Sequence, residues 1–175
     1  MKKIFLVLLS TTLFTIVISF CGYRLYAESG SNKDKKAIVK AKSLTGPMNN
    51  TKAGQGTNSS KSTATNVSIT LDLSEDGASV AKITISIGEV KFEVKTSDFV
   101  SSGTSSGENQ YLNGPFSIKN GIFKTTEGSG ISLASGRFIS PEKAEGSAHL
   151  YSFESVAGQS YKMDLGEWEW KATAK

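Results

Sequence analysis

Apolar and polar residues alternate with a period of two over the last two-thirds of the chain. The clearest run holds Val67, Ile69, Leu71 and Leu73, with polar residues between them. A period of two predicts strands with one buried face. The same alternation occurs at 83–87, 90–94 and 168–170, and more weakly at 116–118, 122–124, 131–133, 137–139, 146–153 and 160–165. No part of residues 67–175 shows a helical period, so the pattern predicts an all-β domain.

Turn-forming sequences separate these predicted strands. They are Asp76-Gly77, Ile87-Gly88-Glu89, Asn113-Gly114-Pro115, Asn120-Gly121 and Ala157-Gly158. About eight to ten short strands with frequent turns indicate an antiparallel β-sandwich or a small barrel. We expect residues 67–175 to fold as this β-sandwich domain without the preceding residues, since the periodic apolar patterns lie inside that range.

The first 27 residues predict a hydrophobic N-terminal helix that serves as a signal peptide or membrane anchor. Two lysines precede an uncharged stretch from Ile4 to Cys21. Three fates are open: cleavage after Ala27, lipidation of Cys21 as in a lipoprotein, or retention as an anchor. Phe20 departs from the small residue that lipoproteins place before the cysteine. Each fate places the rest of the chain outside the cytoplasm: periplasmic, membrane-tethered or secreted.

Residues 28–66 are predicted to be a disordered polar linker. The segment is rich in Lys, Ser, Thr, Asn and Gly and has few large apolar residues. Such a composition does not bury enough apolar surface to offset the entropy of ordering the backbone.

The net charge of +4 and the pI of about 9.1 describe the whole chain and not the predicted domain. Residues 1–27 carry a charge of +3 and residues 28–66 carry +5, which leaves −4 for residues 67–175. No basic run with interleaved aromatic residues occurs in the domain, so nucleic acid is not an expected partner. Membrane contact is expected only through the N-terminal segment.

Two stretches of the domain resemble small β-sandwich modules of secreted bacterial proteins. The first runs from Gly114 to Phe123 and contains an aromatic strand and an Asn-Gly turn. The second runs from Ser135 to Gly146 and contains a Gly-x-Phe-x-Ser…Ala-x-Gly pattern. The resemblance implies a sandwich fold and an extracytoplasmic location. Those modules have no catalytic residues to carry over, so the resemblance implies no enzymatic activity.

Candidate metal and catalytic chemistry is weak in this sequence. The stretch Asp72-Leu73-Ser74-Glu75-Asp76-Gly77 resembles the start of a calcium loop, but Ile83 occupies the position of the closing carboxylate. A hairpin turn is the better interpretation. His149 is the sole histidine, and the domain has no helical period with which the Gly-x-Ser-x-Gly sequence at 103–107 could form a nucleophile elbow, so a surface strand position is favoured over a catalytic one. The sole cysteine, Cys21, precludes a disulfide or a thiolate site in the domain.

Trp168 and Trp170 share one face of the last predicted strand, opposite Glu167, Glu169 and Lys171. The alternation favours a place in the core, and a ligand-stacking platform is the alternative. We expect no catalytic, cofactor or metal residues. The sequence therefore predicts a non-enzymatic, exported or envelope-tethered interaction module, with an envelope protein or a glycan as partner. The alternatives are a structural or accessory subunit of an envelope complex and, less favoured, a secreted hydrolase.

Overall fold

The computed structural model describes residues 41–54, 61–126 and 130–175 of the chain. These residues form nine strands and no helix. The strands are β1 (Ser43–Lys52), β2 (Lys61–Thr65), β3 (Ser68–Leu73), β4 (Ser79–Lys95), β5 (Val100–Ser117), β6 (Ile122–Lys124), β7 (Ile131–Ser140), β8 (Lys143–Val156) and β9 (Gln159–Ala174). The prediction of an all-β fold is confirmed. No helix of the described part is long and apolar enough to cross a membrane.

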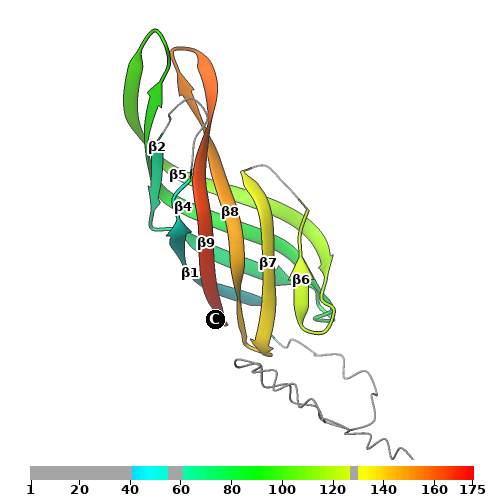
Figure 1. The fold of residues 1–175 in the computed structure, drawn as a ribbon. Coiled ribbons are helices and arrows are strands. Elements are labelled where there is room, and N and C mark those ends of the chain that lie inside the picture. The colour runs from blue at the N-terminus through cyan, green and yellow to red at the C-terminus, as the bar shows by residue number, and fades with distance from the viewer. Residues whose placement is uncertain (1–40, 55–60, 127–129) are drawn as a thin grey trace, which may run out of the picture. The chain divides into compact units, whose positions relative to one another are not determined.

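All nine strands belong to one antiparallel sheet (Figure 1). Along one edge of β4, β3 and β2 pair in turn, and β5 pairs along the other edge. β1 lies between β3 and β9, and the sheet continues from β9 through β8 and β7 to β6. β1 thus joins the β3–β4–β5 half of the sheet to the β6–β9 half.

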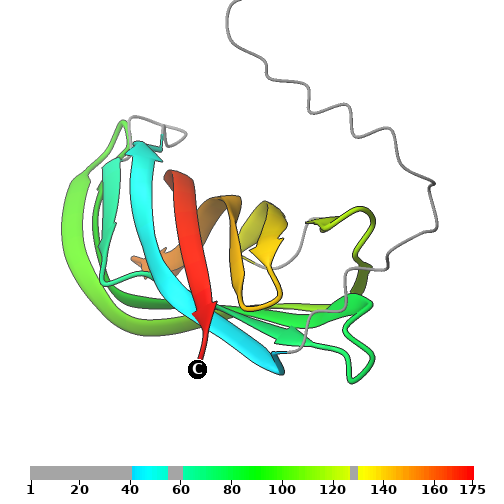
Figure 2. The same ribbon diagram turned by 90° about the horizontal axis from the view of Figure 1, so that it is seen from below.

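The two halves of the sheet contribute side chains to one apolar core. In Figure 1, β4 and β5 run at an angle behind β7, β8 and β9, and Figure 2 shows the sheet curving around the space between them. Leu71 and Ile85 from one half and Leu150 and Trp170 from the other are buried in the same cluster. Burial of each such apolar side chain contributes about 1.5 to 3 kcal/mol of stability, and this burial is the main force that holds the halves together.

β4 and β5 bend together at a pair of glycines. The buried positions on β4 change from odd to even numbers between Ile87 and Val90. Gly88 lies at this change. Gly107, which has a φ of +73°, occupies the matching place on β5 between the pairs Ile87–Glu108 and Glu89–Ser106. The turn predicted at residues 87–89 is therefore wrong, because a strand that bends and changes its buried face resembles a strand break in the sequence.

Beyond the bend, two hairpin ends share a second, smaller core. It consists of Val94, Val156 and Met163, with partly buried aromatic side chains around it. On the inner face of β8, Ser152 and Glu154 lie between this small core and Leu150 of the main core. The interior of the molecule therefore contains an apolar body, a polar layer and an apolar tip.

The linker predicted for residues 28–66 is wrong where the structure describes that range. β1 is a central strand and β2 pairs with β4, so the boundary predicted at residue 67 cuts through one sheet. The inward positions of β1 are Leu44, Gly46 and Met48, and the glycine interrupts the apolar alternation that would have indicated a strand. The predicted N-terminal helix, Ala27 and Cys21 lie outside the described residues.

The other turn predictions divide into three confirmed and one wrong. Turns occur at Asp76-Gly77, Asn120-Gly121 and Ala157-Gly158. The predicted turn at residues 113–115 lies inside β5, opposite a register shift between Val80 and Lys82. The predicted weak strands at 131–133 and 137–139 are parts of one strand, β7.

Candidate functional site

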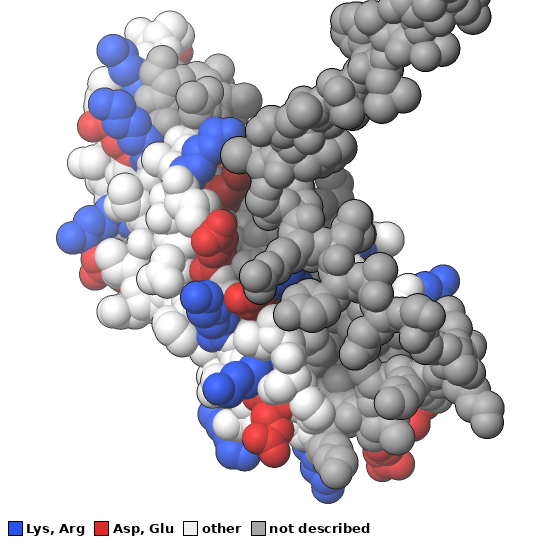
Figure 3. Space-filling model, turned by 60° about the horizontal axis from the view of Figure 1, so that its bottom comes forward, with Lys and Arg blue, Asp and Glu red and all other residues white. Residues whose placement is uncertain are grey.

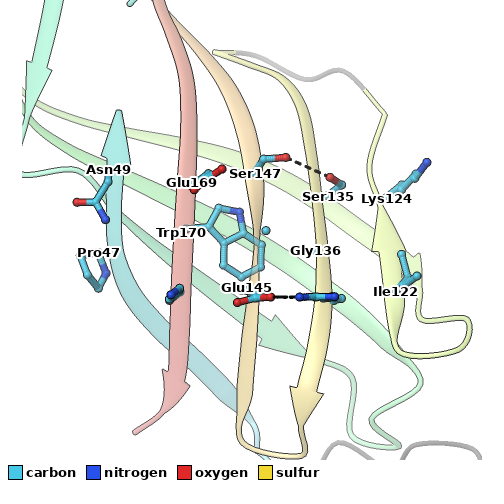
Figure 4. A pocket seen from close by; sticks show the side chains of 13 residues that line it. Pro47, Asn49, Ile122, Lys124, Ser135, Gly136, Glu145, Ser147, Glu169 and Trp170 are labelled. Carbon is cyan, nitrogen blue, oxygen red and sulfur yellow. Dashed lines mark hydrogen bonds and ion pairs between the residues drawn. The ribbon is translucent and has the colours of Figure 1, made fainter. Parts of the chain in front are cut away.

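A groove among the described residues lies on the outer face of the β6–β9 half and is the candidate site. It has a volume of about 690 Å³ and crosses five strands from β6 to β1 (Figure 4). Its lining residues are Pro47, Asn49, Ile122, Lys124, Ser135, Gly136, Arg137, Glu145, Gly146, Ser147, Glu169, Trp170 and Lys171. Because they come from five neighbouring strands at one level of the sheet, the groove runs across the strands.

Two rows of cross-strand neighbours supply the outward side chains of the groove. The first row follows the register Lys124–Ser135–Ser147–Glu169–Asn49. The second row includes Ile122–Arg137–Glu145–Lys171. Strand pairing therefore fixes the order of charges and hydroxyls along the groove.

The row between these two points into the core and forms the floor of the groove. It contains Phe123, Gly136, Gly146 and Trp170 in register. A Cβ atom on Gly136 would lie 2.5 Å from Cη2 of Trp170, and a Cβ atom on Gly146 would lie 2.5 Å from Cζ2. The two glycines thus leave room for the indole to extend beneath β8 and β7 until it stacks on Phe123, with ring centroids 6.2 Å apart. The groove consequently has a packed aromatic layer directly under its backbone floor.

Charges of both signs are distributed along the groove. Arg137 donates from Nε and Nη2 to Oε1 of Glu145, with 2.8 Å between Nε and Oε1. Across the described ranges, Lys124, Lys171 and Glu169 form no ion pair within 4.0 Å. Figure 3 shows that basic and acidic side chains are also interspersed on the face that it presents. The groove therefore offers two unpaired cations and one unpaired carboxylate to a ligand.

Two hydroxyl groups lie in the middle of the groove. Oγ of Ser135 and Oγ of Ser147 are 3.5 Å apart on neighbouring strands. A hydroxyl both donates and accepts hydrogen bonds, so this part of the floor can match either kind of ligand group. The short serine side chains also keep the centre of the groove open.

His149 lies outside the groove and contacts Asp164. Nε2 of His149 is 2.7 Å from Oδ1 of Asp164, which also accepts a hydrogen bond from the backbone N of Gly166 at 2.8 Å. A small pocket of about 220 Å³ borders the pair. Oγ of Ser62 donates to the backbone O of Asp164 and not to the histidine. The pair therefore links β8 to the bulge in β9, and the nearby Ser62 hydroxyl is directed to the backbone and not to the imidazole.

The two tryptophans are part of the core, as the alternation predicts. Trp168 is 4% exposed and Trp170 is 1% exposed. Nε1 of Trp168 donates to the backbone O of Leu165 at 2.9 Å. Neither indole presents a free face at the surface, so the ligand-stacking alternative for Trp168 and Trp170 is wrong in this structure.

The calcium-like sequence forms the turn between β3 and β4. Oδ1 of Asp76 accepts hydrogen bonds from Oγ of Ser74 and from the backbone N of Ala78, at 2.7 and 2.9 Å. Asp76 thus closes the turn through its own side chain, in agreement with the hairpin interpretation. Within the described ranges no group of three His, Cys, Asp or Glu side chains is close enough to hold a metal ion.

The alternation of apolar residues does not indicate the groove, because the groove is not built from the apolar positions. The groove is built from the polar positions of the same strands, including Glu169 and Lys171, which served only to indicate the exposed face of the last strand. A signal was present in Gly136 and Gly146, since glycine in a strand often marks a close approach. No family model, curated protein or solved structure matches this chain.

Proposed function

We propose that this chain is a non-enzymatic, exported or envelope-tethered module that binds a ligand in the groove of the β6–β9 half. The observation that carries the proposal is a groove lined by Lys124, Lys171 and Glu169, whose charges form no ion pair among the described residues. The hydroxyl groups of Ser135 and Ser147 lie in its open centre. Unpaired charged side chains that line a concave surface are typical of a binding site. The packed Trp170 layer beneath the floor supports a preformed site.

The exported location is proposed on the sequence of residues 1–27 alone, through cleavage after Ala27, lipidation of Cys21 or retention as an anchor. We further propose that the antiparallel sheet is a β-sandwich, on the ground that both halves contribute to one core. The partner would then be a protein or a glycan of the cell envelope.

A groove-filling substitution tests the proposal. Ser147→Tyr places a large side chain on the floor at a strand position where tyrosine is well tolerated. The residue-matched control is Ser155→Tyr, at an exposed position of β8 outside the groove. Each protein is used to capture partners from an envelope extract of the source organism, after circular dichroism has verified folding.

We expect the unmodified protein and the Ser155 variant to retain the same partner and the Ser147 variant to lose it. Equal retention by all three proteins would overturn the groove as the binding face. Hydrolysis of envelope polymers by the unmodified protein would instead support the secreted-hydrolase alternative.

The accessory-subunit alternative has one observation of its own. β5 is eighteen residues long and pairs with β4 only among the described strands. A long edge without lysine or proline from Val100 to Gly107 suits pairing with a strand of another protein. Ser102→Lys with Ser106→Lys would abolish capture if this edge is the docking element, and would leave capture unchanged if the groove is.

A further inference from the structure

We infer that the ligand of the groove is an extended peptide segment that carries an acidic and a basic side chain about four residues apart. This inference rests on the proposed function, since it assigns a ligand class to the same groove. The observations behind it are the positions of Lys124 and Glu169, the hydroxyl groups between them and the apolar residue beside Lys124.

The spacing of the ligand charges follows from the strand register. Lys124 on β6 and Glu169 on β9 belong to one cross-strand row, with β7 and β8 between them. Three strand spacings of about 4.8 Å separate them by about 14 Å. An extended chain advances about 3.4 Å per residue, so side chains four residues apart span this distance.

The groove surface between Lys124 and Glu169 suits a peptide backbone. Ser135 and Ser147 occupy the two intervening positions of the row. Their hydroxyls donate and accept hydrogen bonds, and an extended peptide presents N–H and C=O groups in alternation. The ligand therefore crosses the strands of the sheet and lies along the row.

An apolar side chain defines one end of the ligand. Ile122 is 49% exposed and lies two residues from Lys124 on the same face of β6. Contact with an apolar side chain of the ligand would bury part of this exposed apolar surface. We therefore assign an apolar residue next to the acidic residue of the peptide.

Two other ligand classes fit the groove less well. A polyanion would meet Glu145 and Glu169 as well as the three cations, and like charges in contact disfavour binding. A neutral glycan is usually held by an exposed aromatic ring, whereas Trp170, the aromatic residue of the lining, is 1% exposed. The mixture of both charges is better matched by a peptide that carries both.

The test measures binding of a fluorescein-labelled peptide with blocked ends, Leu-Glu-Ser-Thr-Ser-Lys, by fluorescence anisotropy. Companion peptides replace its Glu by Gln, its Lys by Gln, or move the Lys two residues closer. The protein variants are Lys124→Gln and Glu169→Gln. Lys95→Gln and Glu75→Gln are charge-matched controls at exposed positions outside the groove.

We expect Lys124→Gln to weaken binding of the parent peptide about two- to fivefold, which is the range of an exposed ion pair. The same substitution should not change the affinity for the peptide in which Gln replaces Glu, because that peptide has no carboxylate to pair with Lys124. Glu169→Gln should likewise weaken binding of the parent peptide and should not change the affinity for the peptide in which Gln replaces Lys. The control variants should bind as the unmodified protein does, and the peptide with closer charges should bind more weakly than the parent.

Binding of all peptides with equal affinity, or of none, would overturn the inference. The Ser147→Tyr variant separates this failure from failure of the proposed function. If it loses a captured partner or a neutral oligosaccharide while no peptide binds, the groove is a binding site for another ligand class. If it loses nothing, both proposals are wrong.

Discussion

The body of the domain and the tip formed by its two long hairpins differ in what fills their interiors. The body core draws on both halves of the sheet and includes Trp170, Phe123 and Leu150. The tip core has three buried residues, Val94, Val156 and Met163. The groove lies entirely on the body. The groove therefore lies over the more extensively packed region.

The layer between body and tip is polar. Glu154, which is 9% exposed, accepts hydrogen bonds from Oγ of Ser105 at 2.7 Å and from Oγ of Ser152 at 3.2 Å. Gln110 donates from Nε2 to Glu108 and to the backbone O of Tyr151. A polar layer contributes less burial energy than an apolar one, so we expect the tip to open independently of the body.

Loss of β1 and β2 should have the largest effect on the body. A chain of residues 67–175 lacks the strand that joins β3 to β9, and we expect it to be unfolded or aggregated. A chain of residues 35–175 should fold. Circular dichroism and thermal melts of the two chains make the comparison, and a cooperative melt of the shorter chain would contradict the central position of β1.

Truncation of one aromatic side chain should then separate body from tip. Trp170→Ala removes the layer beneath the groove and should lower the free energy of unfolding by about 3 to 5 kcal/mol. Met163→Ala in the tip core should cost about 2 kcal/mol, at the low end for a buried methionine. Urea titrations followed by circular dichroism give both values, and a larger loss for Met163 would reverse the comparison.

The glycine floor allows a more local test of the body. Gly136→Ala adds a Cβ atom 2.5 Å from the indole of Trp170, and overpacking of this kind should cost about 1 to 3 kcal/mol. The control is Ser135→Ala at the preceding residue, whose side chain faces the groove. This substitution should change the free energy of unfolding by less than about 0.5 kcal/mol. Equal effects of the two substitutions in urea titrations would mean that the indole does not pack under the floor.

Removal of a hydroxyl from the polar layer should have a small effect that is confined to the tip. Ser105→Ala deletes a donor to Glu154 and should cost about 1 kcal/mol. Amide hydrogen exchange should accelerate in residues 152–163 and stay unchanged at the groove positions 135–137, 145–147 and 169–171. Uniform acceleration throughout the domain would show that body and tip open as one unit.

Neutralisation of the groove charges should have the smallest effect on folding. Lys124→Gln and Glu169→Gln alter exposed side chains without ion pairs in the described structure, so the melting temperature should be nearly unchanged. A pronounced drop in melting temperature would mean that these charges stabilise the folded state, which contradicts their role as unpaired ligand-binding groups.

The alternation of apolar residues was sufficient to predict the strands whose inward positions are large and apolar, such as those of Ile83–Ile87 and Trp168–Trp170. It failed for β1, where Gly46 interrupts the pattern, and for β5, where inward positions include Ser105 and Gln110. These strands form because their neighbours supply hydrogen bonds and apolar contacts from distant parts of the chain, which a local pattern does not contain.

The groove depends on register in the same way. Its rows bring together Lys124, Ser147 and Glu169, which are far apart in the sequence, through pairings that no local pattern specifies. The burial of Trp168 and Trp170 was predictable because it follows from alternation within one strand.

Residue-resolved amide hydrogen exchange of β1 tests the account most directly, because this strand joins the two halves of the sheet and contributes Pro47 and Asn49 to the groove. We predict that the amides of Leu44, Thr45 and Met48 exchange as slowly as those of β9, with which β1 pairs. Exchange at the rate of an unstructured peptide would show that residues 43–52 are a linker, and the groove would lose one of its walls.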